Sequence, residues 1–175
     1  MLAPLVRRTL APRGQTPVLR QKASHRDRVS VVAGLSISPR RLRPGLYFQT
    51  HPKGYVNNVK AAGFVRAALR HLRGRVVVLW DNGRMHHGEP IRALLSRFPR
   101  LSIEYLPPYA PDLNAVEQLW TLLKYGRLSN YAAPDVRTLD QVAQEHLTVI
   151  RRSPRFLRSF HAASKLPLWD ATPIT

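Results

Sequence analysis

The amino-acid sequence predicts an α/β domain with a mixed sheet, and two observations support this prediction. Strand-like segments come first along the chain, and helical and strand-like segments then alternate. The chain has 175 residues and an apolar fraction of 44%, which is enough for one domain with a hydrophobic core.

Three short apolar segments precede the first expected helix. They cover residues 16–21, 28–37 and 46–51, and the basic turn "SPRRLRPG" separates the last two. Because the connections are short, we expect antiparallel strands here. Residues 57–73 then place their apolar side chains at helical spacing. Arg66, Arg70 and Arg73 fall on another face of this helix, where a solvated basic face and a DNA contact are both open interpretations.

The alternation of strands and helices begins at residue 75. The run "VVVLW", followed by Asp-Asn-Gly, predicts a central strand over residues 75–83 that is buried on both faces. A helix over residues 89–98 starts near Pro90, and a strand follows over residues 101–106. Two further helices are expected over residues 114–128 and 139–152.

The charge of the chain is strongly one-sided. It has 28 Lys and Arg residues against 10 Asp and Glu residues, for a formal net charge of +18. Such an excess favours a polyanionic partner, with nucleic acid first and an anionic membrane surface as the alternative. No apolar run is long enough for a transmembrane helix. Cysteine is absent, which excludes disulfides and thiolate metal sites.

Asp81 directly follows the expected central strand. In open α/β sheets, functional groups gather at the carboxyl ends of strands, so this position is suited to a catalytic or metal-binding carboxylate. Turn chemistry is the structural alternative, because Asp81, Asn82 and Gly83 form a good turn sequence. The apolar run before Asp81 favours the functional interpretation.

The stretch "LPPYAPDLNAVEQLW" contains a second candidate, Glu117. If Asn114 caps the following helix, Glu117 is its capping-box partner, which stabilises the helix by roughly 1 kcal/mol without any function. Glu117 also lies in a first turn that follows a strand end, so it can project toward the same sheet edge as Asp81. We expect the side chain of Asp112 to tie the turn to the start of this helix.

Two carboxylates from a strand end and a helix start are typical of a magnesium site. A pair of such ions can activate the attacking oxygen and stabilise the leaving oxygen in phosphoryl transfer. In a strongly basic domain, the expected substrate is a nucleic-acid backbone. His86 is a candidate auxiliary residue for phosphate contact or proton transfer, although packing on the loop explains it equally well. With His87 it forms only a weak zinc pattern.

The segments "RTLAPRGQTPVL", "VVVLWDNGRMHHG" and "LPPYAPDLNAVEQLW" resemble the catalytic domain of insertion-sequence transposases in the mariner superfamily. They occur in the family's order, and the resemblance covers nearly the whole chain. The resemblance implies a ribonuclease-H-like fold and a DDE triad that holds two Mg²⁺ or Mn²⁺ ions. Asp81 matches the second acid and Glu117 the third, with Asn82, Asp112 and Asn114 in the supporting turns.

The first acid of the family has no matching residue. It lies on the family's first strand, just before the segment that opens this sequence, so we expect an N-terminally truncated domain with an incomplete first strand. Asp27 is the first acid present and is a weak candidate replacement. We expect residues 1–150 to form the partial catalytic domain and residues 151–175 to form a basic C-terminal tail, either extended or packed on the domain.

The expected function is DNA cleavage and strand transfer in the transposition of an insertion sequence, by a chain that is inactive alone. The alternative is a non-catalytic basic fragment that binds DNA or a full-length transposase. Expected partners are transposon ends and target DNA, together with a second copy or a full-length transposase, and no membrane. The expected location is the bacterial cytoplasm, in association with the nucleoid.

Overall fold

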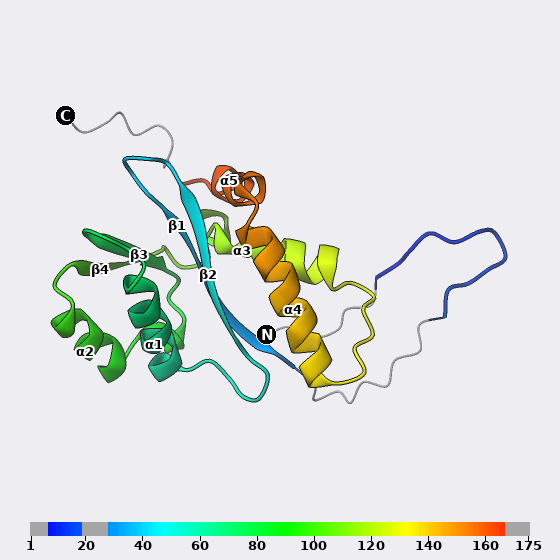
Figure 1. Ribbon diagram of the computed structural model, residues 1–175, viewed down its shortest axis with the longest axis horizontal. Coiled ribbons are helices and arrows are strands. Elements are labelled where there is room, and N and C mark those ends of the chain that lie inside the picture. Colours follow the sequence, from blue (N-terminus) through cyan, green and yellow to red (C-terminus); the bar gives the residue numbers. More distant parts are fainter. Residues whose placement is uncertain (1–6, 19–27, 167–175) are drawn as a thin grey trace.

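The computed structural model describes residues 7–18 and 28–166 and has the mixed α/β composition that the sequence predicts (Figure 1). Its elements in chain order are β1 (Ser30–Ile37), β2 (Pro44–His51), α1 (Asn58–Leu69), β3 (Val76–Trp80), the 3-10 turn η1 (Arg84–His86), α2 (Glu89–Arg97), β4 (Leu101–Tyr105), the 3-10 turn η2 (Pro111–Leu113), α3 (Val116–Thr121), the π-helical η3 (Leu122–Arg127), α4 (Val136–Arg151) and α5 (Pro154–Ala163). Of the strand expected over residues 16–21, residues 16–18 form no strand and the rest lie outside the described residues.

Local polar side chains determine where two of the longer helices begin. Asn57 precedes α1, and its side-chain oxygen accepts a hydrogen bond from the Lys60 N–H at 3.0 Å. Asp135 precedes α4 and accepts from the Thr138 N–H at 2.7 Å. Each cap satisfies an N–H group of the first turn that has no partner inside the helix. The same bond keeps the pKa of Asp135 below its ordinary value.

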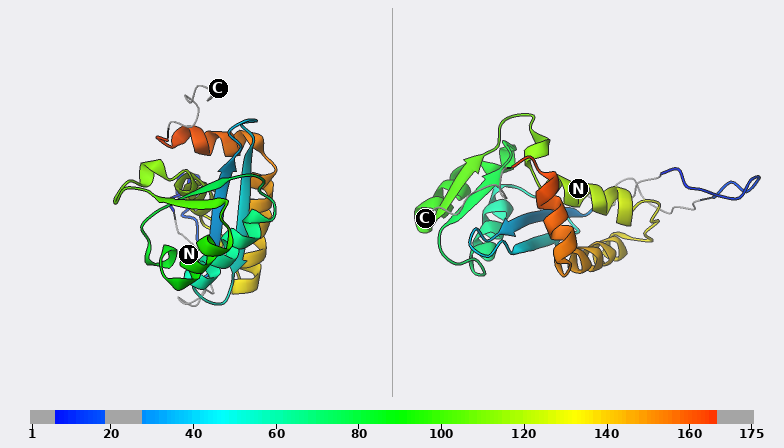
Figure 2. Two further views of the ribbon diagram at one scale, coloured as in Figure 1. Left: turned by 90° about the vertical axis from the view of Figure 1, so that its left-hand side faces the viewer. Right: turned by 90° about the horizontal axis from the view of Figure 1, so that it is seen from above.

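The β1–β2 hairpin lies between two groups of elements. Its strands are antiparallel, with Ser30 opposite His51 and Ile37 opposite Pro44. Helices α3, α4 and α5 lie on one side of it, and α1, α2, β3 and β4 lie on the other (Figures 1 and 2). Because side chains alternate along a strand, Val31 packs toward the first group and Val32 toward the second.

The first core joins the hairpin to the C-terminal helices. Its largest fully buried side chains are Val29, Leu119, Leu123, Leu139, Leu147 and Ile150. Those on α4 recur at helical spacing, so one stripe of that helix faces the core. Helix α5 lies in the stretch expected as a tail, and it adds Leu157 and Phe160 to this core. None of the helices in the described part of the chain is long and apolar enough to cross a membrane.

The second core lies between α1, α2 and one face of the β3–β4 pair. Val76, Val78 and Trp80 of β3 pack against it. The opposite face of β3 is open, with Val77 59% and Leu79 39% exposed. The prediction that this strand is buried on both faces is therefore wrong for the described residues. The physical reason is that α1 and α2 cover only one face of the pair.

The strands form two separate ladders. β3 and β4 are parallel, with Val76 opposite Leu101 and Trp80 opposite Tyr105. Within residues 7–18 and 28–166, each sheet has two strands, and no ladder joins β1 or β2 to β3 or β4. The single mixed sheet expected from the sequence is thus not completed by these residues.

Residues 7–18 project away from the body of the molecule (Figures 1 and 2). Every residue of this segment is exposed. Arg7 anchors its beginning, because the backbone N–H of Arg7 donates to Asn130 Oδ1 at 2.7 Å and its guanidinium donates to the Tyr125 carbonyl at 2.9 Å.

Arg100 ties the end of α1 to the start of β4. Its guanidinium donates to the carbonyl oxygens of Leu69, Leu72 and Gly74, with the last two at 2.9 and 2.8 Å.

Replacement of Arg100 by Ala is expected to lower the free energy of unfolding by about 2 kcal/mol, since charged hydrogen bonds are lost from partly buried carbonyls. Urea unfolding measures the change, and Arg97→Ala, an exposed site on α2, is the control. Equal losses in the two variants would contradict this role.

Candidate active site

Asp81 lies in a tight turn at the carboxyl end of β3. Its Oδ1 accepts a hydrogen bond from the Gly83 N–H at 2.9 Å, and its side chain is 57% exposed. Asn82 Nδ2 donates to the Leu106 carbonyl at 2.8 Å, and the Leu106 N–H donates to the Trp80 carbonyl at 2.7 Å. The turn therefore joins the carboxyl ends of the two parallel strands, while Asp81 still faces solvent.

His86 is the nearest imidazole to this carboxylate. Its Nε2 lies 3.2 Å from Asp81 Oδ1, and its ring stacks on Trp80 with the centroids 4.2 Å apart. Burial lowers the pKa of His86, although the Asp81 charge acts in the opposite direction. Burial of the imidazole and the charge of Asp81 thus act in opposite directions on the pKa of a ring that lies directly beside the carboxylate.

The loop that carries His86 is held tightly against β4. Tyr105 Oη donates to the His86 carbonyl at 2.9 Å, and the Tyr105 ring stacks on His87 with the centroids 4.7 Å apart. A Cβ at Gly83 would lie 2.9 Å from Asp81 Oδ1, so a larger residue there would push the Asp81 carboxylate from its present position. Trp80 and Tyr105 were not singled out from the sequence. The one sequence feature that could have indicated them is that each is an aromatic residue at the last position of its parallel strand.

Glu117 lies in the first turn of α3. Asn114 helps to start the helix, but its Oδ1 accepts from the Val116 N–H at 3.3 Å, and the Glu117 N–H donates to the Asn114 backbone carbonyl at 3.0 Å. The N-cap position belongs to Ala115, so the expected capping box is not formed. The Glu117 side chain is partly exposed, and its carboxylate makes no hydrogen bond or ion pair with the described residues.

The expectation that the Asp112 side chain ties the turn to the start of α3 is wrong. Its side chain does not cap α3 but pairs with Lys165, with Oδ2 and Nζ 2.6 Å apart. The Lys165 N–H also donates to the Asp112 carbonyl at 3.0 Å. The hydrogen bond to Asp112 raises the pKa of Lys165. Asp112 thus ties the turn before α3 to the segment after α5, a long-range contact that no local pattern indicates.

The donor chemistry of Asp81 and Glu117 fits a hard divalent cation, which prefers carboxylate oxygens. Neither carboxylate has a Lys or Arg partner in the described residues, whereas Glu89 pairs with Arg92 and Asp112 with Lys165. No group of three or more His, Asp or Glu side chains that could hold a metal occurs within residues 7–18 and 28–166. Asp27, the candidate replacement for the first acid, lies outside the described residues.

Comparison with known protein families decides the identity of the domain. The family model described as "DDE superfamily endonuclease" matches residues 2–140, which is most of the chain. The chain belongs to the DDE endonuclease superfamily. The DDE endonuclease family that the three sequence segments predict is thereby confirmed. When this sequence is compared with curated proteins, no significant match is found.

Solved structures of mariner transposase share the fold of this DDE endonuclease chain. The strand transfer complex of Mos1 matches with a TM-score of 0.60 at 18% identity, over 94% of this chain and 48% of that one. The Mos1 paired-end complex with the left transposon end gives 0.59 at 19% identity, over 94% and 49%. The Mos1 paired-end complex with Mn gives 0.58 at 18% identity, over 94% and 53%. The chain thus spans about half the length of these structures.

Proposed function

We propose that this chain is the catalytic domain of a mariner-type transposase that cleaves and joins DNA during the transposition of an insertion sequence. The observation that carries the proposal is the turn after β3. It presents Asp81 at the carboxyl edge of a parallel strand pair, in a chain that belongs to the DDE endonucleases. The strand that follows, β4, leads through η2 to Glu117 in the first turn of α3.

Asp81 and Glu117 are the proposed ligands for Mg²⁺ or Mn²⁺. When bound, a pair of such ions supplies charge stabilisation for the attacking and leaving oxygens of a phosphodiester. Asp81 offers a solvent-facing carboxylate that Gly83 and His86 hold in one orientation. Glu117 offers a carboxylate without a competing basic partner among the described residues. Asn82 and Asn114 position the two turns, and His86 acts as an orienting residue.

We further propose that the 175-residue chain is inactive by itself. The family resemblance calls for three acids, and the described residues supply no three-residue metal group. This same observation favours a second candidate function, a basic fragment that binds DNA or a full-length transposase without cutting. DNA is the proposed partner in both cases, with the bacterial nucleoid as the location, and the net charge of +18 supports it.

Iron-mediated cleavage of the protein backbone tests whether Asp81 and Glu117 share a site. Fe²⁺ bound in place of Mg²⁺ generates hydroxyl radicals with ascorbate and peroxide, and these cut the nearby backbone. We expect fragments that end close to residue 81 and close to residue 117, both suppressed by excess Mg²⁺. Asp81→Asn and Glu117→Gln should each remove both cuts, because the carboxylates hold the metal together.

Glu145→Gln is the matched control for the iron experiment, since Glu145 is an exposed carboxylate on α4 without an ion pair in the described region. It should leave both cuts unchanged. Cuts near only one of the two acids would overturn the proposal of a shared metal site, and so would loss of only one cut in each variant. Neither result would bear on DNA binding.

A further inference from the structure

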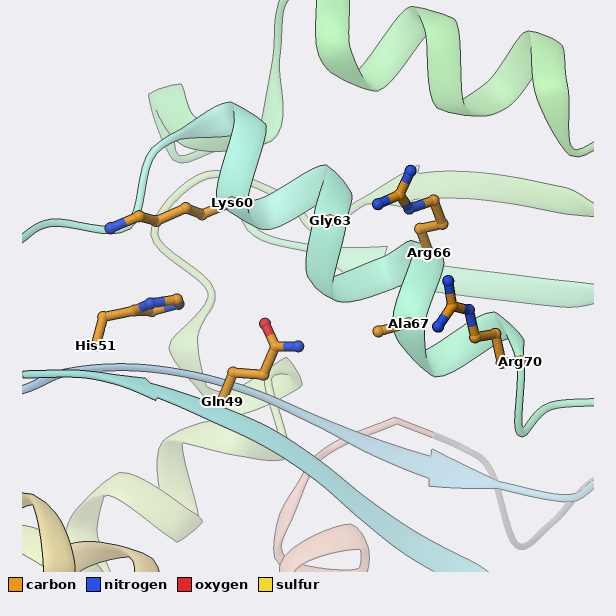
Figure 3. Close-up of a pocket in the computed structure, with 7 residues that line it drawn as sticks. All are labelled: Gln49, His51, Lys60, Gly63, Arg66, Ala67 and Arg70. Carbon is orange, nitrogen blue, oxygen red and sulfur yellow. The ribbon is translucent and has the colours of Figure 1, made fainter.

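A basic cleft lies between β2 and α1, and Asp81 is not among the residues that line it (Figure 3). It has a volume of about 280 Å³ and is lined by Gln49, His51, Lys60, Gly63, Arg66, Ala67 and Arg70. Gln49 and His51 come from β2, Lys60 extends from one end of α1 above His51, and Arg66 and Arg70 extend from the other end of the helix (Figure 3).

The cations of the cleft have no acidic partner in the described part of the chain. The ion pairs found there involve Asp81, Glu89 and Asp112, and none reaches Lys60, Arg66 or Arg70. Lys60 Nζ instead donates to the Tyr55 carbonyl at 2.9 Å, which holds the ammonium at one end of the cleft. Lys60, Arg66 and Arg70 thus line one cleft without an ion pair in the described residues, an arrangement that attracts an anion.

The helix face that forms one wall is shaped by small residues. Gly63 and Ala67 are one helical turn apart and line the cleft between Lys60, Arg66 and Arg70. A Cβ at Gly63 would meet no atom within 4 Å, so the space beside it is open. The buried Nε2 of His51 has no hydrogen-bond partner among the described residues. The cleft therefore combines open volume with donors and polar atoms that have no partner.

The lining chemistry indicates a phosphate group rather than a base. Arg binds phosphate oxygens through paired N–H groups, and Lys adds a point charge. No Phe, Tyr, Trp or large apolar side chain lines the cleft, and its one ring is the imidazole of His51, so it offers little surface on which bases would stack. A contact that reads only phosphates positions a nucleic acid without reading its sequence.

The cleft also follows on from the turn at the active site. Asn58, the first residue of α1, donates from Nδ2 to the carbonyl of His87 at 3.3 Å. The start of α1 therefore contacts the loop after Asp81, and Lys60, Arg66 and Arg70 follow progressively farther along the helix. From Lys60 to Arg70 the helix axis advances about 15 Å at 1.5 Å per residue, which matches about four nucleotides of one DNA strand.

We propose that the β2–α1 cleft binds the phosphate backbone of a DNA segment that runs along α1, separate from the metal-binding acids. Arg66 and Arg70 contact successive phosphates, Lys60 contacts one nearer the active-site loop, and Gln49 contributes an amide donor. This site rests on the DNA-binding part of the proposed function but not on the metal site. Its test is binding without divalent metal.

The test compares two pairs of substitutions that remove the same charge. Arg66→Gln with Arg70→Gln alters the cleft, and Arg155→Gln with Arg158→Gln alters exposed positions on α5. Fluorescence anisotropy measures binding of the full chain to a labelled duplex of mixed sequence, in EDTA, across a salt series. Each phosphate contact contributes about −0.9 to the slope of log affinity against log salt concentration. The affinity of the unaltered chain falls between about 50 and about 200 mM salt, and loss of two contacts should make this fall roughly tenfold smaller. The substitutions on α5 should alter this fall in affinity by less than about twofold.

A second pair tests the space itself. Gly63→Glu and Gly63→Gln both fit, because the position beside Gly63 is open. The negative charge of Gly63→Glu should weaken DNA binding well beyond the effect of Gly63→Gln, and thermal unfolding confirms that both variants are folded. Equal losses of DNA affinity for the two arginine pairs, or equal DNA binding by the two Gly63 variants, would overturn the proposal that this cleft binds DNA. Binding of inorganic pyrophosphate as tight as that of duplex would also overturn a DNA backbone site.

Discussion

The 175-residue chain is expected to show no Mg²⁺- or Mn²⁺-dependent cleavage or joining of DNA that carries the element's terminal repeats. The DDE arrangement calls for three acids around two ions, and the described residues offer no group of three. Mg²⁺ demands near-ideal octahedral geometry, so an ion held by fewer protein ligands is poorly aligned with the phosphodiester. The in-line position of the attacking and leaving oxygens depends on both ions.

The decisive comparison is with a version extended upstream by a strand that carries the family's first Asp. This version should cleave in the presence of metal, and Asp81→Ala in it should return the rate to the level seen in EDTA. Glu145→Ala, at an exposed position on α4, should keep the activity. Metal-dependent cleavage by the 175-residue chain that disappears in its Asp81→Ala variant would contradict the prediction. Asp27 would then be the next residue to replace.

Leu147→Ala is expected to lower the free energy of unfolding by about 3–5 kcal/mol. Leu147 is 0% exposed and belongs to the core that joins α4 to the hairpin and to α5. Truncation removes apolar contacts and leaves a cavity, because close-packed neighbours relax only partly. Such a loss is a large share of the total stability of a domain, typically about 5–15 kcal/mol.

Val149→Ala is the matched control for the core substitution. Val149 lies on the same helix but is 54% exposed, so its truncation should change stability by no more than about 0.5 kcal/mol. Urea unfolding followed by circular dichroism measures both variants. A Leu147→Ala loss as small as that of Val149→Ala would mean that α4 does not depend on this core.

Short-range patterns were enough to predict the type and approximate position of the elements. The helical spacing after Asn57 corresponds to α1, and the apolar run before Asp81 corresponds to β3. These features are local, because a cap or an alternation of side chains acts on backbone groups a few residues away. The position of Asp81 directly after a strand followed for the same reason. The resemblance of three segments then indicated the family, which the family model confirmed.

The partner of each side chain was decided only by the tertiary structure. Asp112 pairs with Lys165 and not with the adjacent helix, since the chain after α5 returns to the turn before α3. Val77 is exposed although its run reads as a buried strand, because helices cover one face of the β3–β4 pair and leave the other open. The sequence by itself indicated the elements from β1 to α4 and placed Asp81 directly after a strand, but it indicated neither α5 nor the absence of a strand at residues 16–18. The open face of β3, the Asp112 contact and the basic cleft depend on which distant segments pack together, which backbone propensity does not encode.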